Sequence, residues 1–454
     1  MIENKSKMSI KSLTFLTGML VFLAPLFMNQ YKEIFELGAA VTGIVMLTVL
    51  FWGLPGSVKT GYLYGTYVAL ATLFVAIYLV PFPDVIHWNE LPGRSLYADV
   101  ANFISAQGVE IAYPSLSLIP GNTQRALFYL VPVLALFLVV MSLPRRSVKT
   151  LVSVFLVVVF FESALGIIQY ASGSDAFYLG NKEHGNTASG TYRNRDHFVA
   201  LLEMALPLAI GIMVAPFISR SDSDERKRDR ESVLSSTLTL SLVIILMLLA
   251  SFFSASRAGI GLVVLGLMLS AFIFAYYVGK IKSLGFLLIA SIVGMGVAFN
   301  VGIIPILNRF ASDPMEDERW RIFENSQRLI SEMFPWGSGP GTFPQVYRAF
   351  QPIEQPHFVN HAHNDYIELI SDMGVFGVLI IAGFAVLYLA RWVSLLRSQR
   401  HGTFKSLQIG AGIGIFLLLL HSYVDFNLHQ MANALIFVFL AAIFFHVNRD
   451  KQGY

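Results

Sequence analysis

The sequence contains no cysteine, and only 13% of its 454 residues are charged. Without cysteine, no disulfide, thiolate nucleophile or cysteine-ligated metal site can form. A soluble protein carries about a quarter charged residues, so this composition is typical of a protein that lies mostly in lipid. The net charge of +3 is unremarkable, and we expect no nucleic-acid partner.

The sequence instead has many apolar runs of about 20 residues, the length that crosses a bilayer as a helix. Hydrophobic residues make up 55% of the chain. We expect an all-α, polytopic membrane protein with about twelve transmembrane helices. The predicted spans cover residues 12–28, 34–52, 61–81, 125–143, 150–171, 197–218, 236–253, 258–279, 283–303, 374–391, 406–424 and 430–447.

These spans divide the chain into three predicted parts. Residues 1–303 hold the first nine spans and two smaller periplasmic loops, residues 304–373 form a large periplasmic loop, and residues 374–454 hold the last three spans. Lys and Arg concentrate in the opposite set of short loops, which predicts that both termini are cytoplasmic. No small-residue cleavage site follows the first span, so it is predicted to be a retained anchor.

Several ionisable residues fall in or beside predicted spans, where each costs about 2.5–3.5 kcal/mol unless it has a partner. Glu162 and Glu203 either pair with an arginine or hydroxyl in the bundle or serve the function. We interpret His421, Asp425 and His429 as closing the last hairpin by mutual hydrogen bonds. These groups lie mostly toward the predicted outer face, whereas a proton-relay pump would need them through the full membrane depth.

Arg257 lies in a tight hairpin of small residues, Ser-Ala-Ser-Arg-Ala-Gly, on the predicted outer side. A fixed guanidinium there suits a phosphate ligand, and a structural ion pair is the alternative. Within the large loop, a helix is predicted from about residue 313 to 333. It carries Arg319 near its start and packs through Trp320, Phe323 and Ile330.

The next turn reads Gly-Ser-Gly-Pro-Gly from Gly337 to Gly341, and its backbone N–H groups form either an anion nest or a simple turn. The loop then reaches His361, His363 and Asp365, just before the tenth span. The positive end of a helix favours neutral imidazole, which can accept a proton from a hydroxyl. Asp365 could orient one imidazole. Because His-x-x-x-His spacing is missing, we expect no metal.

His363-Asn364, followed after nine residues by Gly374 and after two more by Gly377, resembles the signature of bacterial O-antigen ligases and the related O-antigen polymerases. One departure is Phe323, where the family often has Trp. Further motifs that resemble the family, in their order along the chain, are residues 191–198, 254–259, 319–323, 337–343 and 361–366.

The resemblance implies glycan transfer on the outer side of the bacterial inner membrane, without a nucleotide sugar, cofactor or metal. The implied donor is a glycan on undecaprenyl diphosphate, a membrane lipid. The implied acceptor is a glycan, lipid A-core or protein hydroxyl. His363 is then the catalytic base, and Arg257 and Arg319 neutralise the diphosphate. Predicted substrate-binding residues are Tyr192, Arg193, Arg195, Gly339, Gly341, His361, Asn364 and Asp365.

Two other classes of protein remain open at this stage. A flippase or other transporter of lipid-linked oligosaccharides explains the spans but not the polar groups gathered at one face. A structural scaffold makes no use of Arg257. Within the transferase class, the sequence does not separate a ligase from a polymerase or from a protein O-oligosaccharyltransferase.

Overall fold

The computed structural model describes residues 2–27, 32–54, 62–81, 90–95, 103, 106–108, 115–178, 186–218, 230–278, 315–398 and 402–447. Regular structure in these residues is helical, apart from one isolated antiparallel bridge between Pro81 and Ser115. The α-helices are α1 (Ile2–Leu26), α2 (Lys32–Gly53), α3 (Tyr62–Ile77), α5 (Pro120–Ser142), α6 (Arg145–Ser172), α7 (Arg195–Ile218), α8 (Arg230–Phe253), α9 (Arg257–Val278), α11 (Met315–Met333), α12 (Phe343–Val346), α13 (Asp365–Arg397), α14 (Thr403–His421) and α15 (Met431–Phe445). Short 3₁₀ helices are η3 (Asp175–Tyr178), η5 (Tyr347–Ala349) and η6 (Asn427–His429).

Within the described residues, nine helices are long and apolar enough to cross a membrane: α1, α2, α5, α6, α7, α8, α9, α13 and α14. Two shorter apolar stretches, Leu63–Ile77 in α3 and Met431–Phe445 in α15, match two more of the predicted spans. The predicted ninth span, residues 283–303, lies outside the described residues. The protein is therefore an all-helical, multi-pass membrane protein, as its composition predicts.

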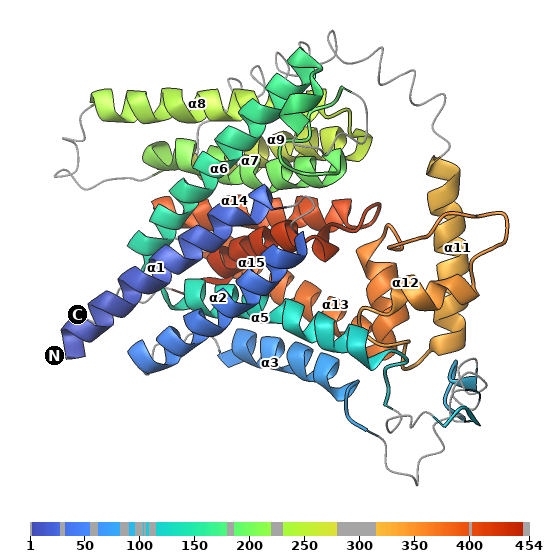
Figure 1. The fold of residues 1–454 in the computed structure, drawn as a ribbon. Coiled ribbons are helices and arrows are strands. Elements are labelled where there is room, and N and C mark those ends of the chain that lie inside the picture. Colours follow the sequence, from blue (N-terminus) through green and yellow to red (C-terminus); the bar gives the residue numbers. More distant parts are fainter. Residues whose placement is uncertain are drawn as a thin grey trace.

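Helices α7 and α14 form the centre of the bundle. In the apolar stretch of α7 89% of the residues are buried, and in that of α14 72% are buried. Figure 1 shows α14 and α15 in the middle, with α6 to α9 on one side and α2, α3 and α5 on the other. Glycines bring the two central helices together: a Cβ on Gly410 would lie 2.5 Å from the carbonyl oxygen of Pro207. A Cβ on Gly414 would lie equally close to Met204. Such small residues allow helix backbones to approach closely in a membrane.

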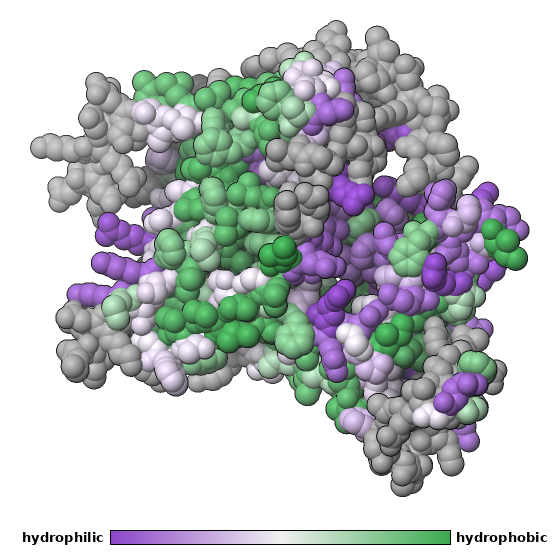
Figure 2. Space-filling model, viewed as in Figure 1, coloured by the Kyte–Doolittle hydropathy of each residue, from purple (hydrophilic) through white to green (hydrophobic). Residues whose placement is uncertain are grey.

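The two ends of the bundle differ in chemistry. At one end, Nε2 of His446 lies 3.0 Å from the Leu143 carbonyl oxygen, and Nε of Arg391 donates to the Phe444 carbonyl at 2.8 Å. At the other end, α13 begins, α14 ends and α11 and α12 extend beyond the bundle (Figure 1). On the face in Figure 2, hydrophobic side chains cover the bundle and hydrophilic ones gather near α11 and α12.

The predicted helix of the large loop is confirmed as α11, which ends at Met333 as expected. Its buried hydrophobic residues are Ile322, Phe323, Leu329 and Met333, and Ile322, Leu329 and Met333 pack with the segment around α12. The prediction that Trp320 packs on this face is wrong, because its side chain is 61% exposed. The apolar face of a helix repeats about every 3.6 residues. Ile322 and Leu329 lie on the buried face of α11, and Trp320 then lies on the opposite face of the helix.

Helix α13 begins at Asp365, nine residues before the predicted span. Gly374 interrupts it with φ 51° and ψ −126°, a conformation that favours glycine. A Cβ at this position would lie 2.0 Å from the carbonyl oxygen of Pro335, which accepts a hydrogen bond from the N–H of Val375 at 2.8 Å. Gly374 therefore lets the turn after α11 pack against α13.

Candidate functional site

The first cluster of charged side chains surrounds Asp425, in the turn after α14. Its carboxyl is 1% exposed, and Oδ1 accepts a hydrogen bond from the Phe426 N–H at 2.9 Å. Nδ1 of His363 lies 3.5 Å from Oδ1, and Nε2 of His197 lies 3.5 Å from Oδ2. Both distances are at the outer limit for a hydrogen bond. Two imidazoles from distant segments thus converge on one buried carboxylate.

Arg319 of α11 joins the same cluster. Its Nη1 donates to the carbonyl oxygen of Val424 at 3.2 Å, and its Nη2 lies 3.8 Å from the carboxylate of Asp196. Burial alone would raise the pKa of Asp425, but His197, His363 and Arg319 outweigh burial and hold that pKa well below its usual range. Asp425 is therefore ionised. We call Asp425, His197, His363 and Arg319 the Asp425 cluster.

His363 itself has a backbone φ of 50°, in the left-handed region that residues other than glycine adopt rarely. Backbone strain of this kind costs about 1–3 kcal/mol and gathers at functional sites. The next residue, Asn364, is the N-cap of α13, and its side-chain oxygen accepts from the N–H groups of Tyr366 and Ile367. The cap fixes where the helix starts and holds His363 just outside it.

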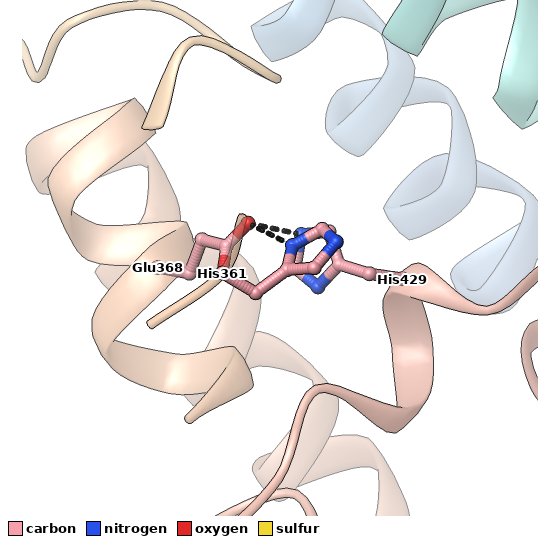
Figure 3. A group of neighbouring side chains, drawn as sticks. All are labelled: His361, Glu368 and His429. Carbon is pink, nitrogen blue, oxygen red and sulfur yellow. Dashed lines mark hydrogen bonds and ion pairs between the residues drawn. The ribbon is translucent and has the colours of Figure 1, made fainter. Parts of the chain in front are cut away.

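The second cluster surrounds Glu368, one turn into α13 (Figure 3). Its Oε1 lies 2.9 Å from Nδ1 of His361 and 3.1 Å from Nε2 of His429. Nδ1 of His429 is 2.8 Å from Oδ1 of Asp365, whose Oδ2 accepts from the Leu428 N–H. Figure 3 shows both imidazoles side by side, facing the carboxylate. We call Glu368, His361, His429 and Asp365 the Glu368 cluster.

The histidines of the Glu368 cluster differ in their affinity for protons. Burial lowers the pKa of His361, although Glu368 opposes the shift. Burial would also lower the pKa of His429, but Glu368 and Asp365 outweigh it and raise that pKa to about 9. In the absence of another cation, His429 is therefore the charged imidazole.

The ring of Phe426 connects the two clusters. The His361 imidazole stacks on it, with centroids 4.3 Å apart and planes at 22°. His363 and His197 meet it edge-on, with centroid distances of 4.9 Å and 4.7 Å. Three imidazoles from two clusters thus share one aromatic ring, which sets their spacing. His361 and His363 both contact Phe426, but His361 faces the carboxylate of Glu368 and His363 faces that of Asp425.

The predicted arginines come from the same end of the bundle. Arg257 is the first residue of α9, and a Cβ on Gly259 would lie 2.3 Å from Cγ1 of Val199 in α7, two residues after His197. The hairpin between α8 and α9 is as tight as predicted, with Ala255 at φ 55°. Arg193 is exposed and Arg195 half-buried just before His197. Their contacts with a diphosphate remain predictions.

Some predicted substrate-binding residues have structural partners instead. Tyr192 is 1% exposed, and its hydroxyl lies 3.1 Å from Oδ1 of Asn433. Asn364 is equally buried as the helix cap, so neither side chain is open to a substrate. Asp365 orients His429 rather than His361 or His363.

The N–H groups of the glycine turn bind oxygen atoms of the protein's own Asp372. The N–H of Gly341 donates to Oδ2 of Asp372 at 2.6 Å, and that of Gly339 donates to the Asp372 carbonyl at 2.8 Å. These glycines have φ values of 76° and 117°, which explains the residue type. Asp372 of α13 occupies both N–H groups in this structure, and a role for Gly339 and Gly341 in substrate binding remains a prediction.

The interpretation of the last hairpin is only partly right: the N–H of Asp425 donates to the His421 carbonyl oxygen at 3.1 Å, but the three polar side chains pair with other residues. Nδ1 of His421 lies 3.1 Å from both carboxylate oxygens of Glu203 in α7. Asp425 and His429 belong to the two clusters. Glu162 instead accepts hydrogen bonds from the N–H and hydroxyl of Thr191, at 2.9 and 2.7 Å. This is the hydroxyl pairing that the sequence left open.

Four residues of the site were not predicted in these roles: His197, Glu368, Asp425 and His429. His197 belongs to a stretch that resembles the family, and Glu368 continues the acidic face of Asp365 and Asp372. Apart from His361, which lies seven residues before Glu368, the side chains that pair with them are distant in the chain and could not be assigned from spacing.

The family comparison agrees with this arrangement of motifs. The model of the O-antigen ligase family matches residues 242–382, a segment that includes Arg257, Arg319 and His363. No curated protein matches the chain. The resemblance carried by the motifs is thus confirmed for the segment from the middle of α8 into α13, which is similar to O-antigen ligases.

Proposed function

We propose that this protein transfers a glycan from undecaprenyl diphosphate to an acceptor sugar hydroxyl on the outer side of the bacterial inner membrane. Both termini are then cytoplasmic, and residues 304–373 form the large periplasmic part. The observation that carries the proposal is that His363 and Arg319, implied as base and cation by the resemblance, meet at one buried carboxylate, Asp425.

In this proposal His363 is the general base. The Asp425 carboxylate favours the tautomer with the proton on Nδ1, because that nitrogen lies nearest to Oδ1. Nε2 then has a free lone pair and can take the proton of the acceptor hydroxyl. Orientation of a base by a buried carboxylate is a recurrent device in nucleophilic catalysis. The 3.5 Å separation fits a site whose hydrogen bonds shorten when substrate binds.

The leaving group needs cations more than an acid, because a diphosphate leaves readily once its charge is neutralised. Arg319 is only partly engaged, since its Nε is buried without a hydrogen bond among the described residues. Arg257, at the start of α9, supplies a second guanidinium in this proposal, and Arg193 or Arg195 a third. Guanidinium forks bind phosphate oxygens in pairs, which fixes the donor as well as stabilising it.

The reaction is then one displacement. The acceptor oxygen forms a bond to the anomeric carbon as the bond from that carbon to the phosphate oxygen breaks. The electron pair leaves with the diphosphate, and the hydroxyl proton moves to Nε2 of His363. A single displacement inverts the anomeric centre. No nucleotide sugar is needed, because the lipid diphosphate already activates the sugar.

The test is a deletion strain that carries the wild-type gene, His363→Ala or His357→Gln. His357 is an exposed histidine in the same loop and serves as the matched control. We expect the wild-type protein and His357→Gln to restore the glycan on a gel, and His363→Ala to leave the donor unused on its lipid. A His363→Ala variant that restores normal glycan would contradict the proposal.

The same strains identify the acceptor and exclude a transporter. Loss of attached glycan with long lipid-linked chains retained indicates a ligase, whereas a single capped repeat indicates a polymerase. Loss of sugar from a protein alone indicates a protein O-oligosaccharyltransferase. A flippase is indicated if the deletion strain accumulates donor on the cytoplasmic side of the membrane and the His363→Ala variant still restores the glycan.

A further inference from the structure

We propose that His361, Glu368 and His429 bind one divalent transition-metal ion. Nδ1 of His361, Oε1 of Glu368 and Nε2 of His429 lie within 4.8 Å of one another. The carboxylate oxygen is 2.9 Å from the first nitrogen and 3.1 Å from the second. In a tetrahedral zinc site with bonds of 2.0–2.1 Å, neighbouring ligand atoms are roughly 3.3 Å apart. A small outward movement of these three groups would make room for the ion.

The direction of the ring nitrogens supports a cation at this point. Nδ1 of His429 is 2.8 Å from Oδ1 of Asp365 and its Nε2 is 3.1 Å from Oε1 of Glu368, so each ring nitrogen faces a carboxylate. Without a metal, a second proton on the imidazole fills the place between Nε2 and Glu368, and a metal ion that binds there would displace that proton. Metal-binding histidines almost always donate their other ring N–H to a carboxylate or carbonyl, as His429 does here.

The ligands are also held in place by other contacts. Oε2 of Glu368 accepts the N–H of Ala362 at 2.8 Å, which leaves Oε1 free to face the imidazoles. His361 is stacked on Phe426, and Asp365 accepts the N–H of Leu428 at 3.0 Å. Glu368 is 2% exposed, but the side chains of His361 and His429 are 20% and 33% exposed. An ion can therefore reach the cluster from the loop side.

The ligand types select the kind of metal. Two imidazoles and one carboxylate suit Zn²⁺ and similar transition ions, whereas Mg²⁺ and Ca²⁺ prefer oxygen ligands throughout. Three protein ligands leave one position for water or substrate, as in catalytic zinc sites. The sequence did not predict this site because one ligand comes from η6 and the other two from the loop and first turn that open α13.

The experiment is a Zn²⁺ titration of the purified full-length protein in detergent micelles, after treatment with a chelator and gel filtration. We expect about one Zn²⁺ per chain by calorimetry and by elemental analysis, unaffected by excess Mg²⁺. His429→Gln and His361→Gln should each weaken binding at least tenfold. Asp365→Asn should weaken it about 10- to 100-fold, the usual effect of removing the carboxylate behind a ligand histidine. His357→Gln should bind as the wild type does.

Thermal unfolding of each variant separates loss of binding from loss of fold, and either histidine variant alone suffices if the other does not fold. Wild-type protein that binds no more Zn²⁺ than a folded His429→Gln or His361→Gln variant would overturn the proposal. The cluster would then be an ion pair held by a proton. Because the measurement is metal binding and not glycan transfer, this proposal and the proposed function can fail separately.

Discussion

The replacement of Asp425 by asparagine tests whether the buried carboxylate acts through His363. Asparagine keeps the size of the side chain but removes the charge that faces both imidazoles and Arg319. A hydrogen bond to a charged group contributes about 1.5–3 kcal/mol, and each 1.36 kcal/mol corresponds to a tenfold change in rate. We therefore expect Asp425→Asn to slow glycan transfer about 10- to 100-fold.

The assay is the initial rate of transfer in membrane vesicles supplied with lipid-linked donor and acceptor, at several pH values. We expect the rate to fall without a matching rise in the donor concentration needed for half-maximal rate, because Asp425 acts on the base and not on binding. Glu324→Gln is the matched control, since that carboxylate pairs with Arg328 at an exposed position of α11. A folded Asp425→Asn protein with a rate within twofold of wild type would refute the role of Asp425 as the positioning residue.

Three further predictions concern stability. Gly374→Ala should prevent accumulation of folded protein, measured by fluorescence size-exclusion chromatography, because its Cβ would collide with Pro335, whereas Gly261→Ala in an open part of α9 should not. His421→Leu should destabilise the protein by about 3–5 kcal/mol by leaving Glu203 buried and unpaired, and adding Glu203→Leu should recover most of that loss in denaturant unfolding. Folding lowers the pKa of Asp425. Its charge therefore stabilises the folded protein fully at pH values above about 3.9, the ordinary pKa of aspartate, and this stabilisation is lost as the pH falls through the pKa of Asp425 in the folded protein. The difference in melting temperature between wild type and Asp425→Asn should therefore stay constant from about pH 5 to 8, and a steady change across that range would contradict this assignment.

The helical, membrane-spanning fold was predictable because lipid imposes a length and a composition on each span. A helix start next to His361 and His363 was expected and is confirmed at Asp365, but the predicted span began nine residues later, since Asp365, Glu368 and Asp372 are too polar for a span in lipid. They are buried in protein instead, against His429, His361 and the glycine turn. A sequence pattern records how polar a residue is, but not whether lipid or protein surrounds it.

The site was predictable in its residue types and only partly in its connections. His363 and Arg319 were identified through motifs, and the structure joins them through Asp425. That connection depends on contacts between α7, α11, the start of α13 and the turn after α14, which no local spacing encodes. The glycine Gly374 of the motif serves packing in the structure, because the turn at Pro335 and Gly337 fits tightly against α13 at this position.

The position of Asp425 in the last hairpin has a consequence for biosynthesis. The chain leaves the ribosome N-terminus first, so the earlier helices can insert and associate before the final two are made. Asp425 and His429 arrive between those two helices, after every other member of both clusters. A nascent or truncated chain that ends before this hairpin therefore displays its arginines and His363 without the carboxylate that organises them. If the proposed function is correct, such a chain should transfer no glycan until the hairpin between α14 and α15 is in place.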